Sequence, residues 1–244
     1  MDGTNGTDGV GGVTGTLALV GGGEWRDGCT FDADLLEASG DRRVVVLPTA
    51  AAYERPERLV VRAAEWFAPL GADVEGVMVL SRGDAADPGT AAVVRRARFL
   101  YLAGGSPMHL RSVLKDSVVW DAVVAAWHDG AVIAGSSAAA MVLTDPMVDA
   151  RGGGLTVGLG LLQGLAVVPH FGDVHEDAHG AKLHRSVLLA PPGIPVAGIP
   201  ERTALVRDPR GAWSSAGAGE VRVFLDGSPA GAGLGALPGP ARVA

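Results

Sequence analysis

The chain has 244 residues, of which 48% are hydrophobic, and its 20 Lys and Arg residues against 27 Asp and Glu residues give a formal net charge of −7. The acidic balance, without a basic stripe, excludes nucleic acid as an expected partner. No stretch offers about 20 continuous apolar residues and no cationic segment precedes an apolar run near the N-terminus, so neither a membrane span nor a secretory signal is predicted. The single cysteine, Cys29, excludes an internal disulfide framework and suits a cytoplasmic location.

The composition predicts one folded domain between two tails. Residues 1–12 are mostly Gly, Asp, Asn and Thr, and are predicted to form a disordered tail. Residues 13–227 are long and apolar enough to form a single α/β domain with one sizeable core. Residues 228–244 are rich in Gly, Ala and Pro, and are predicted to form a flexible C-terminal tail.

Short apolar runs alternate with helical patterns along this domain. Strands are predicted at Leu17–Val20, Val44–Leu47, Val74–Leu80, Phe99–Ala103, from Ala131, and at Leu165–Val168, Val196–Ile199, Ala204–Val206 and Val221–Leu225. Helices are predicted over Arg55–Leu70, Pro88–Arg98 and Val118–Asp129, and a further helix is predicted to open at Pro107. The alternation predicts an α/β fold, a mostly parallel twisted sheet flanked by helices in a three-layer sandwich.

The segment Ala131-Val-Ile-Ala-Gly-Ser-Ser-Ala-Ala-Ala140 has the pattern of a nucleophile elbow. A buried strand runs into a Gly-Ser-Ser turn and then into an alanine-rich helix, which is the context that exposes a serine hydroxyl on a strained backbone. The pattern G-x-S-x-G is met except that Ala139 replaces its last glycine. Ser137 is therefore the candidate nucleophile; the alternative is a small-residue crossing of strand and helix in which a serine only caps the helix.

Two further features fall at predicted strand ends, where parallel α/β sheets gather their chemistry. His170 follows Val168-Pro169 and can take the proton of Ser137 if the two side chains meet. The backbone N–H of Ala138 and one from the Gly104-Gly105 loop can donate to an oxyanion. A carboxylate is then needed to orient the imidazole.

Four ordered motifs, spanning about Leu17 to Val223, resemble the dipeptidase E / cyanophycinase family of serine peptidases. They are Tyr101-Leu-Ala-Gly-Gly-Ser-Pro-Met-His-Leu110, the elbow, Val167-Val-Pro-His-Phe171 and Gly198-Ile-Pro-Glu-Arg-Thr-Ala-Leu-Val206. The resemblance implies a class I glutamine-amidotransferase-like fold and a catalytic domain that cleaves a peptide or small amide bond. It implies Ser137 as nucleophile, His170 as base, and Gly105 and Ala138 as oxyanion-hole donors, with no cofactor.

The resemblance places the acid between the elbow and the histidine, where the chain offers Asp145 and Asp149. The Asp145-Pro-Met-Val run is similar to the dipeptidase pattern, so Asp145 is preferred and completes a Ser-His-Asp triad. Glu201 in the Gly-Ile-Pro-Glu motif is a further candidate, for which a role as a buried hydrogen-bond anchor is favoured.

Departures from the family pattern affect the expected substrate. Pro107 stands where cyanophycinases carry a glutamine, and His179 stands where dipeptidase E carries the arginine that binds an N-terminal aspartate. His179 and Arg185 are predicted to contact the substrate, without strict selection of N-terminal aspartate, because imidazole lacks the bidentate, permanently cationic grip of guanidinium. The expected partner is a short peptide or small amide, and a homodimer is compatible with the sequence.

Two alternatives to serine chemistry remain open. His175-Glu-Asp-Ala-His179 is a literal H-E-x-x-H, the pattern of a zinc hydrolase in which Glu176 would be the base. Gly180 follows it at once, and Pro169 and Gly172 precede it, which favours a polar substrate-facing loop and no catalytic metal. A catalytically silent binding protein on the same fold is the second alternative.

Overall fold

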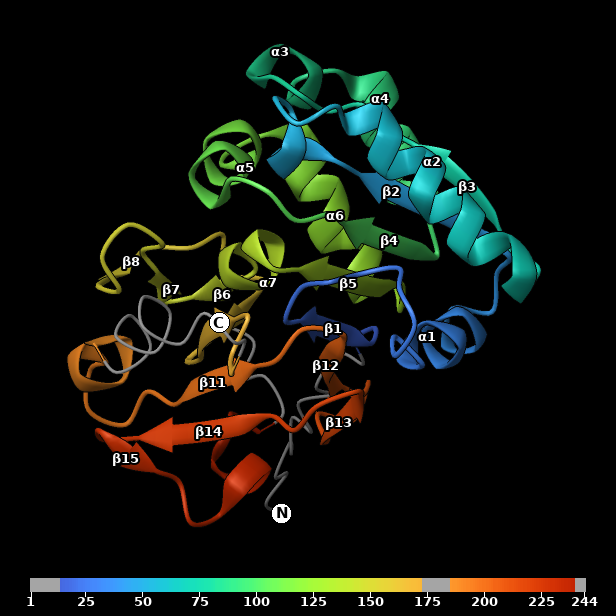
Figure 1. Cartoon of the computed structure of the whole chain (residues 1–244). Coiled ribbons are helices and arrows are strands. Elements are labelled where there is room, and N and C mark those ends of the chain that lie inside the picture. Colours follow the sequence, from blue (N-terminus) through green and yellow to red (C-terminus); the bar gives the residue numbers. More distant parts are fainter. Residues whose placement is uncertain (1–13, 173–184, 240–244) are drawn as a thin grey trace, which may run out of the picture.

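The computed structural model of the chain describes residues 14–172 and 185–239, and its centre is a seven-stranded sheet (Figure 1). The strand order is β13-β12-β1-β5-β4-β2-β3. Strands β1, β5, β4, β2 and β3 are mutually parallel, whereas β12 and β13 run antiparallel to their neighbours. The bounds are β1 (Leu17–Val20), β2 (Arg43–Leu47), β3 (Asp73–Gly76), β4 (Phe99–Leu102), β5 (Val132–Ser136), β12 (Thr203–Arg207) and β13 (Trp213–Gly217).

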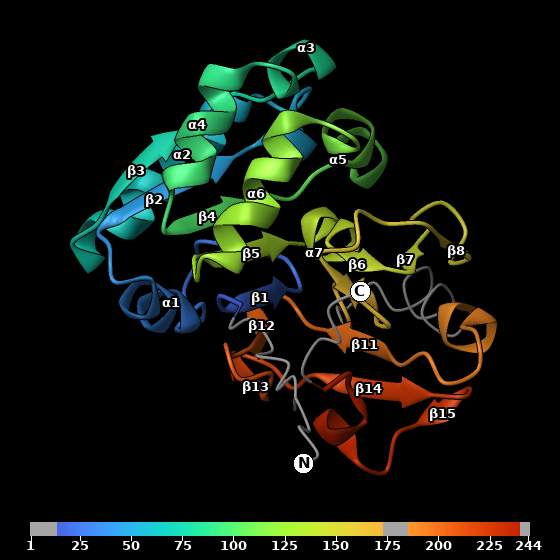
Figure 2. The ribbon, with the colours of Figure 1, turned by 180° about the vertical axis from the view of Figure 1, so that it is seen from behind.

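Helices cover both faces of this sheet, which confirms the predicted α/β class (Figure 2). They are α1 (Phe31–Ser39), α2 (Pro56–Phe67), α3 (Arg82–Ala85), α4 (Pro88–Arg96), α5 (Pro107–Leu114), α6 (Val118–His128) and α7 (Ala138–Val142), with 3-10 turns at Thr49–Ala51, Ala68–Leu70 and Gly233–Ala236. Local chemistry fixes several of their starts. Asp87, Ser106 and Ser117 each accept a backbone N–H of the first turn of α4, α5 and α6.

Alternation along each strand divides the hydrophobic core between the two faces. In β2, Val44 and Val46 pack with α1 and α2, while Val45 and Leu47 pack with α4, α5 and α6 on the opposite face. All four side chains are fully buried. The central strands are thus buried on both sides, as expected for a parallel sheet.

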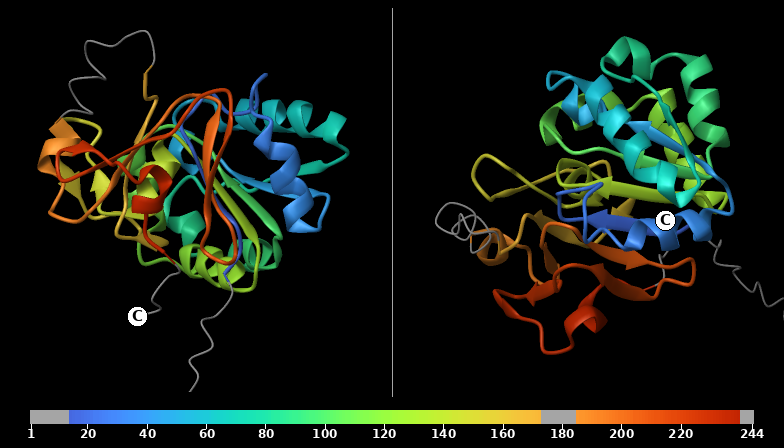
Figure 3. Two further views of the ribbon diagram at one scale, coloured as in Figure 1. Left: turned by 90° about the horizontal axis from the view of Figure 1, so that it is seen from below. Right: turned by 45° about the vertical axis from the view of Figure 1, so that its right-hand side comes forward.

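The later strands form a second, four-stranded sheet instead of extending the first. Its order is β10-β11-β14-β15, with bounds β10 (Ala166–Pro169), β11 (Val196–Ile199), β14 (Arg222–Leu225) and β15 (Ser228–Pro229). Figure 3 shows it beneath the larger sheet. The chain passes from the second sheet back to the first at Pro200–Arg202, between β11 and β12. Buried residues of β10, β11 and β14 join the cluster that also contains α7.

The segment between α7 and β10 forms two short strand pairs, β6 with β9 and β7 with β8. The bounds are β6 (Thr144–Asp145), β7 (Met147–Val148), β8 (Leu155–Thr156) and β9 (Leu162–Gln163). No helix among the described residues is both long and apolar enough to cross a membrane.

The C-terminal segment differs from its prediction. Residues 228–239, expected to be a flexible tail, contain β15 and a 3-10 turn, and Leu237 is buried. The indole N–H of Trp213 donates to the carbonyl of Pro238 at 2.8 Å. The predicted N-terminal tail, residues 1–12, lies outside the described residues.

Candidate active site

Ser137 lies at a sharp turn between β5 and α7. Its backbone has φ 51° and ψ −110°, a conformation that non-glycine residues rarely adopt. The amide of Ser137 donates to the carbonyl of Val20 at 2.8 Å, which ties the turn to the end of β1. This is the strained strand–turn–helix geometry that the sequence predicted.

Ala139 fits into this elbow because the residue at the start of the motif is a glycine. A Cβ on Gly135 would lie 2.5 Å from Cδ1 of Leu143 and 3.3 Å from the Cβ of Ala139. The space that a side chain at 135 would take is therefore filled by Ala139 and Leu143. The methyl group of Ala139 is fully buried, and the elbow conformation is retained with it in place.

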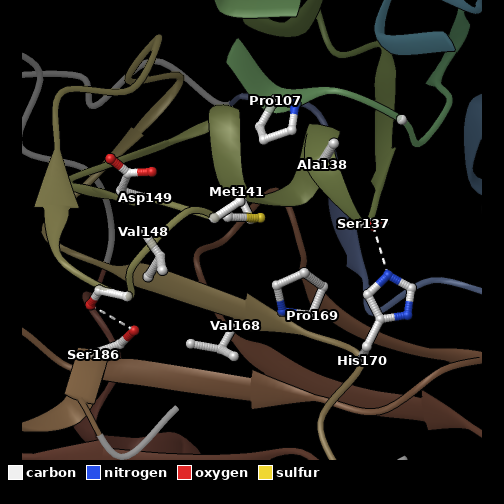
Figure 4. A pocket seen from close by; sticks show the side chains of 13 residues that line it. Pro107, Ser137, Ala138, Met141, Val148, Asp149, Val168, Pro169, His170 and Ser186 are labelled. Carbon is white, nitrogen blue, oxygen red and sulfur yellow. Dashed lines mark hydrogen bonds between the residues drawn. The ribbon is translucent and has the colours of Figure 1, made fainter. Parts of the chain in front are cut away.

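A chain of hydrogen bonds connects Ser137 to a carboxylate through His170. The distance from Ser137 Oγ to His170 Nε2 is 2.7 Å, and the distance from His170 Nδ1 to Glu201 Oε1 is 2.9 Å. An ionised carboxylate only accepts hydrogen bonds, so Nδ1 carries the proton and Nε2 accepts from the serine hydroxyl. Figure 4 shows the ring of His170 turned toward Ser137.

The backbone of Gly21 and Gly22 holds the histidine and the carboxylate against the elbow. The amide of His170 donates to the carbonyl of Gly21 at 2.8 Å, and the amide of Arg202 donates to the carbonyl of Gly22 at 2.7 Å. Gly22 has φ 117°, and a Cβ there would lie 2.3 Å from Cε1 of His170. Only glycine therefore allows the imidazole to lie this close to the loop that follows β1.

The carboxylate beside His170 belongs to Glu201 and not to Asp145, the residue preferred from the sequence. Asp145 ends β6, and its Oδ1 accepts a hydrogen bond from the amide of Gly158 at 3.0 Å. Asp149, the other acid weighed in this segment, accepts hydrogen bonds from Arg151. These bonds hold the pKa of Asp149 down at about 2. Glu201 comes to His170 because the crossing from β11 to β12 begins next to the end of β10.

The two expected oxyanion donors lie beside Ser137. Ala138 is the first residue of α7, where a helix has no intrahelical acceptor for its amide. Gly105 has φ 142°, and a Cβ there would lie 2.4 Å from the carbonyl oxygen of Ala50. Ala138, Gly105 and Ser137 all line one cavity of about 150 Å³.

The other predicted site residues fall away from this cavity or outside the described residues. Arg185 is exposed, although its neighbour Ser186 lines the cavity. His179, and with it the whole H-E-x-x-H run, lies outside the described residues. Within the described ranges no group of three or more His, Cys, Asp and Glu side chains is arranged to hold a metal ion.

One buried contact beside Ser137, between Ser136 and Glu24, was not expected from the sequence. The hydroxyl of Ser136, fully buried at the end of β5, donates to Glu24 Oε2 at 2.7 Å. Oε1 of Glu24 lies 3.8 Å from the guanidinium of Arg62. The one signal in the sequence that could have pointed to Glu24 is its position directly after the Gly21-Gly22-Gly23 run, at the end of a predicted strand.

Comparison with known proteins places the chain in a family. The model of peptidase family S51 matches residues 17–212, so the chain belongs to this family of serine peptidases. It is a serine-type peptidase of the peptidase E type. It is 28% identical over 174 residues to peptidase E of Citrobacter koseri, covering 66% of this chain and 71% of that protein.

Two solved structures resemble the fold. The crystal structure of a peptidase from an acI-B1 actinobacterium has a TM-score of 0.77 and 29% identity, over 88% of this chain and 93% of that chain. That of a putative peptidase E protein from Listeria monocytogenes has a TM-score of 0.60 and 16% identity, over 87% of this chain and 98% of that chain. The second supports the fold alone.

Proposed function

We propose that the chain hydrolyses a peptide or small amide bond through a Ser137-His170-Glu201 triad and an acyl-enzyme. The observation that carries the proposal is the continuous hydrogen-bonded chain from the Ser137 hydroxyl through both ring nitrogens of His170 to Glu201. In such an arrangement the base activates the serine and the carboxylate fixes the tautomer and stabilises the imidazolium.

In the first half of this reaction His170 Nε2 takes the hydroxyl proton while Ser137 Oγ bonds to the substrate carbonyl carbon. The oxygen of that carbonyl becomes an oxyanion, for which the amides of Gly105 and Ala138 are the proposed donors. His170 then gives its proton to the leaving nitrogen, the C–N bond breaks, and the acyl group stays on Ser137.

Water completes the cycle. His170 takes a proton from the water, whose oxygen bonds to the acyl carbon. The bond to Ser137 Oγ then breaks, His170 returns the proton to the serine, and the acid product leaves. Removing the serine of such a triad costs about 10⁶-fold in kcat.

The test is covalent labelling with a fluorophosphonate, followed by mass spectrometry of the modified peptide. We expect one phosphonyl group on Ser137, and neither labelling nor hydrolysis in Ser137→Ala. Ser214→Ala, which changes an exposed serine of β13, is the matched control and should label as the wild type does. A label at another residue, or turnover that survives Ser137→Ala, would exclude this mechanism.

A further inference from the structure

The cavity beside Ser137 has a reacting end and an apolar body. Ser137 and His170 lie at one end, and Asp149 and Ser186 lie toward the other, as Figure 4 shows. Its body is lined by apolar side chains from four elements. These are Pro107 of α5, Met141 of α7, Val148 of β7, and Val168 and Pro169 of β10. A group that enters the cavity from the reacting end therefore exchanges water for hydrocarbon.

The polar groups at the far end are already engaged. The buried hydroxyl of Ser186 donates to the carbonyl of Gly153 at 2.9 Å. The carboxylate of Asp149 accepts from Nε of Arg151 at 3.0 Å and from its NH2 group at 2.7 Å, a bidentate pair. Arg151, the cation next to this wall, is thus held by a carboxylate of the protein itself.

We propose that this cavity receives an uncharged aliphatic side chain, of the size of leucine or methionine, from the residue whose carbonyl Ser137 attacks. The inference rests on the proposed function. The cavity extends away from the Ser137–His170 pair along α7, from Ala138 to Met141, and so begins at the amides proposed to hold the carbonyl oxygen. The acyl group is the part of the substrate that remains there after the amine leaves.

Charge disfavours an acidic side chain in the same place. Among the described residues that line the cavity, apart from His170, no side chain is a cation, and the one fixed charge is the carboxylate of Asp149. An aspartate side chain would lose its hydration against apolar walls, and the Asp149 carboxylate at the far end offers it no hydrogen-bond donor. The lining that the described residues supply therefore favours an apolar side chain over a carboxylate.

The test is a series of aminoacyl p-nitroanilides that share one leaving group, with Leu, Met, Ala, Lys and Asp as the acyl residue. We expect kcat/KM for Leu and Met to exceed that for Ala by about 10–200-fold, the range for differences in apolar contact. Asp should be the poorest of the series. Met141→Ala and Val148→Ala should lower kcat/KM about tenfold for Leu and Met, and by less for the Ala substrate, whose methyl group reaches less of this wall.

Val61→Ala is the control, since Val61 is an apolar residue of α2 that is 56% exposed and lies outside the cavity. Its substrate profile should match the wild type. Three results would each overturn this inference and leave the proposed mechanism standing. They are highest activity on Asp, equal activity across the acyl series, and no hydrolysis of any member by an enzyme that the fluorophosphonate still labels on Ser137. Failure of Ser137 to label would instead remove the mechanism on which the inference rests.

Discussion

The imidazole of His170 lies directly on the backbone of Gly22, so closely that a Cβ at position 22 would overlap the ring. Gly22→Ala should therefore push the ring away from Ser137, and a displacement of about 1 Å is enough to cost about 100-fold in kcat. Steady-state kinetics on a hydrolysed anilide measures the loss. Gly71→Ala, at another positive-φ glycine but with open space around it, controls for backbone strain. Equal kinetics in the two variants would show that the contact with His170 has no effect on turnover.

The second prediction separates the three candidate acids. Glu201→Gln should lower kcat by about 10³–10⁴-fold, because the imidazole loses the partner that fixes its tautomer. Asp145→Asn and Asp149→Asn should each cost less than tenfold, since their carboxylates bond Gly158 and Arg151. The comparison is made under single-turnover conditions with the same substrate. A large loss in Asp145→Asn with little change in Glu201→Gln would restore the acid preferred from the sequence.

The third prediction concerns the buried contact between Ser136 and Glu24. Glu24→Ala leaves the Ser136 hydroxyl without its acceptor, which should lower the free energy of unfolding by about 1–3 kcal/mol. Glu24→Gln keeps an acceptor oxygen and should recover most of that loss. Urea unfolding of Glu24→Ala, Ser136→Ala and the double variant measures the coupling. If the two single losses simply add in the double variant, the contact contributes nothing of its own.

The fourth prediction is a pH dependence of stability from Asp32 on α1. Its side chain is fully buried, accepts the indole N–H of Trp66 at 2.9 Å, and burial raises its pKa to about 8. The unfolded chain ionises this group near pH 4, whereas the folded chain keeps the proton until about pH 8. The contribution of Asp32 to the free energy of unfolding is therefore complete below pH 4. It is lost between pH 4 and 8, by up to about 1.4 kcal/mol per pH unit.

Urea unfolding of the wild type and Asp32→Asn from pH 5 to 8 tests this sign. The wild type should lose stability relative to the variant as pH rises. Asp34→Asn, an exposed position on the same helix, should follow the wild type. Parallel curves for the wild type and Asp32→Asn would contradict a buried, protonated Asp32.

Most of the main sheet could be predicted, because its inner strands are short apolar runs and several of its helices carry clear starts. The edge strand β13, which is polar and mostly exposed, and helix α1 were not predicted. Pro107 and the capping Asp87 stand where the structure begins α5 and α4. The strand Val196–Ile199 matches β11 residue for residue. Its membership of a second sheet was not predictable, because a hydrophobic period indicates a strand but not the strand it pairs with.

The contact between Ser137 and His170 could be expected from local patterns, and the carboxylate that lies beside His170 could not. Ser137 is set by a strand–turn–helix pattern within ten residues. The partner of His170 depends on a crossing between two sheets that brings Glu201 to it from 31 positions away in the chain. Glu24 was missed for the same reason, since its contact with Ser136 spans 112 positions.

Ser137 and His170 belong to different sheets, and the backbone at the end of β1 is the segment that holds both of them in place. Ser137 follows a strand of the larger sheet, while His170 follows a strand of the smaller one, and both are bonded to the segment that ends β1. A slight sliding of one sheet against the other would separate Ser137 from His170 without breaking the backbone hydrogen bonds within either sheet. The rate of hydrolysis should therefore respond to a small shift between the two sheets that leaves the secondary structure content unchanged.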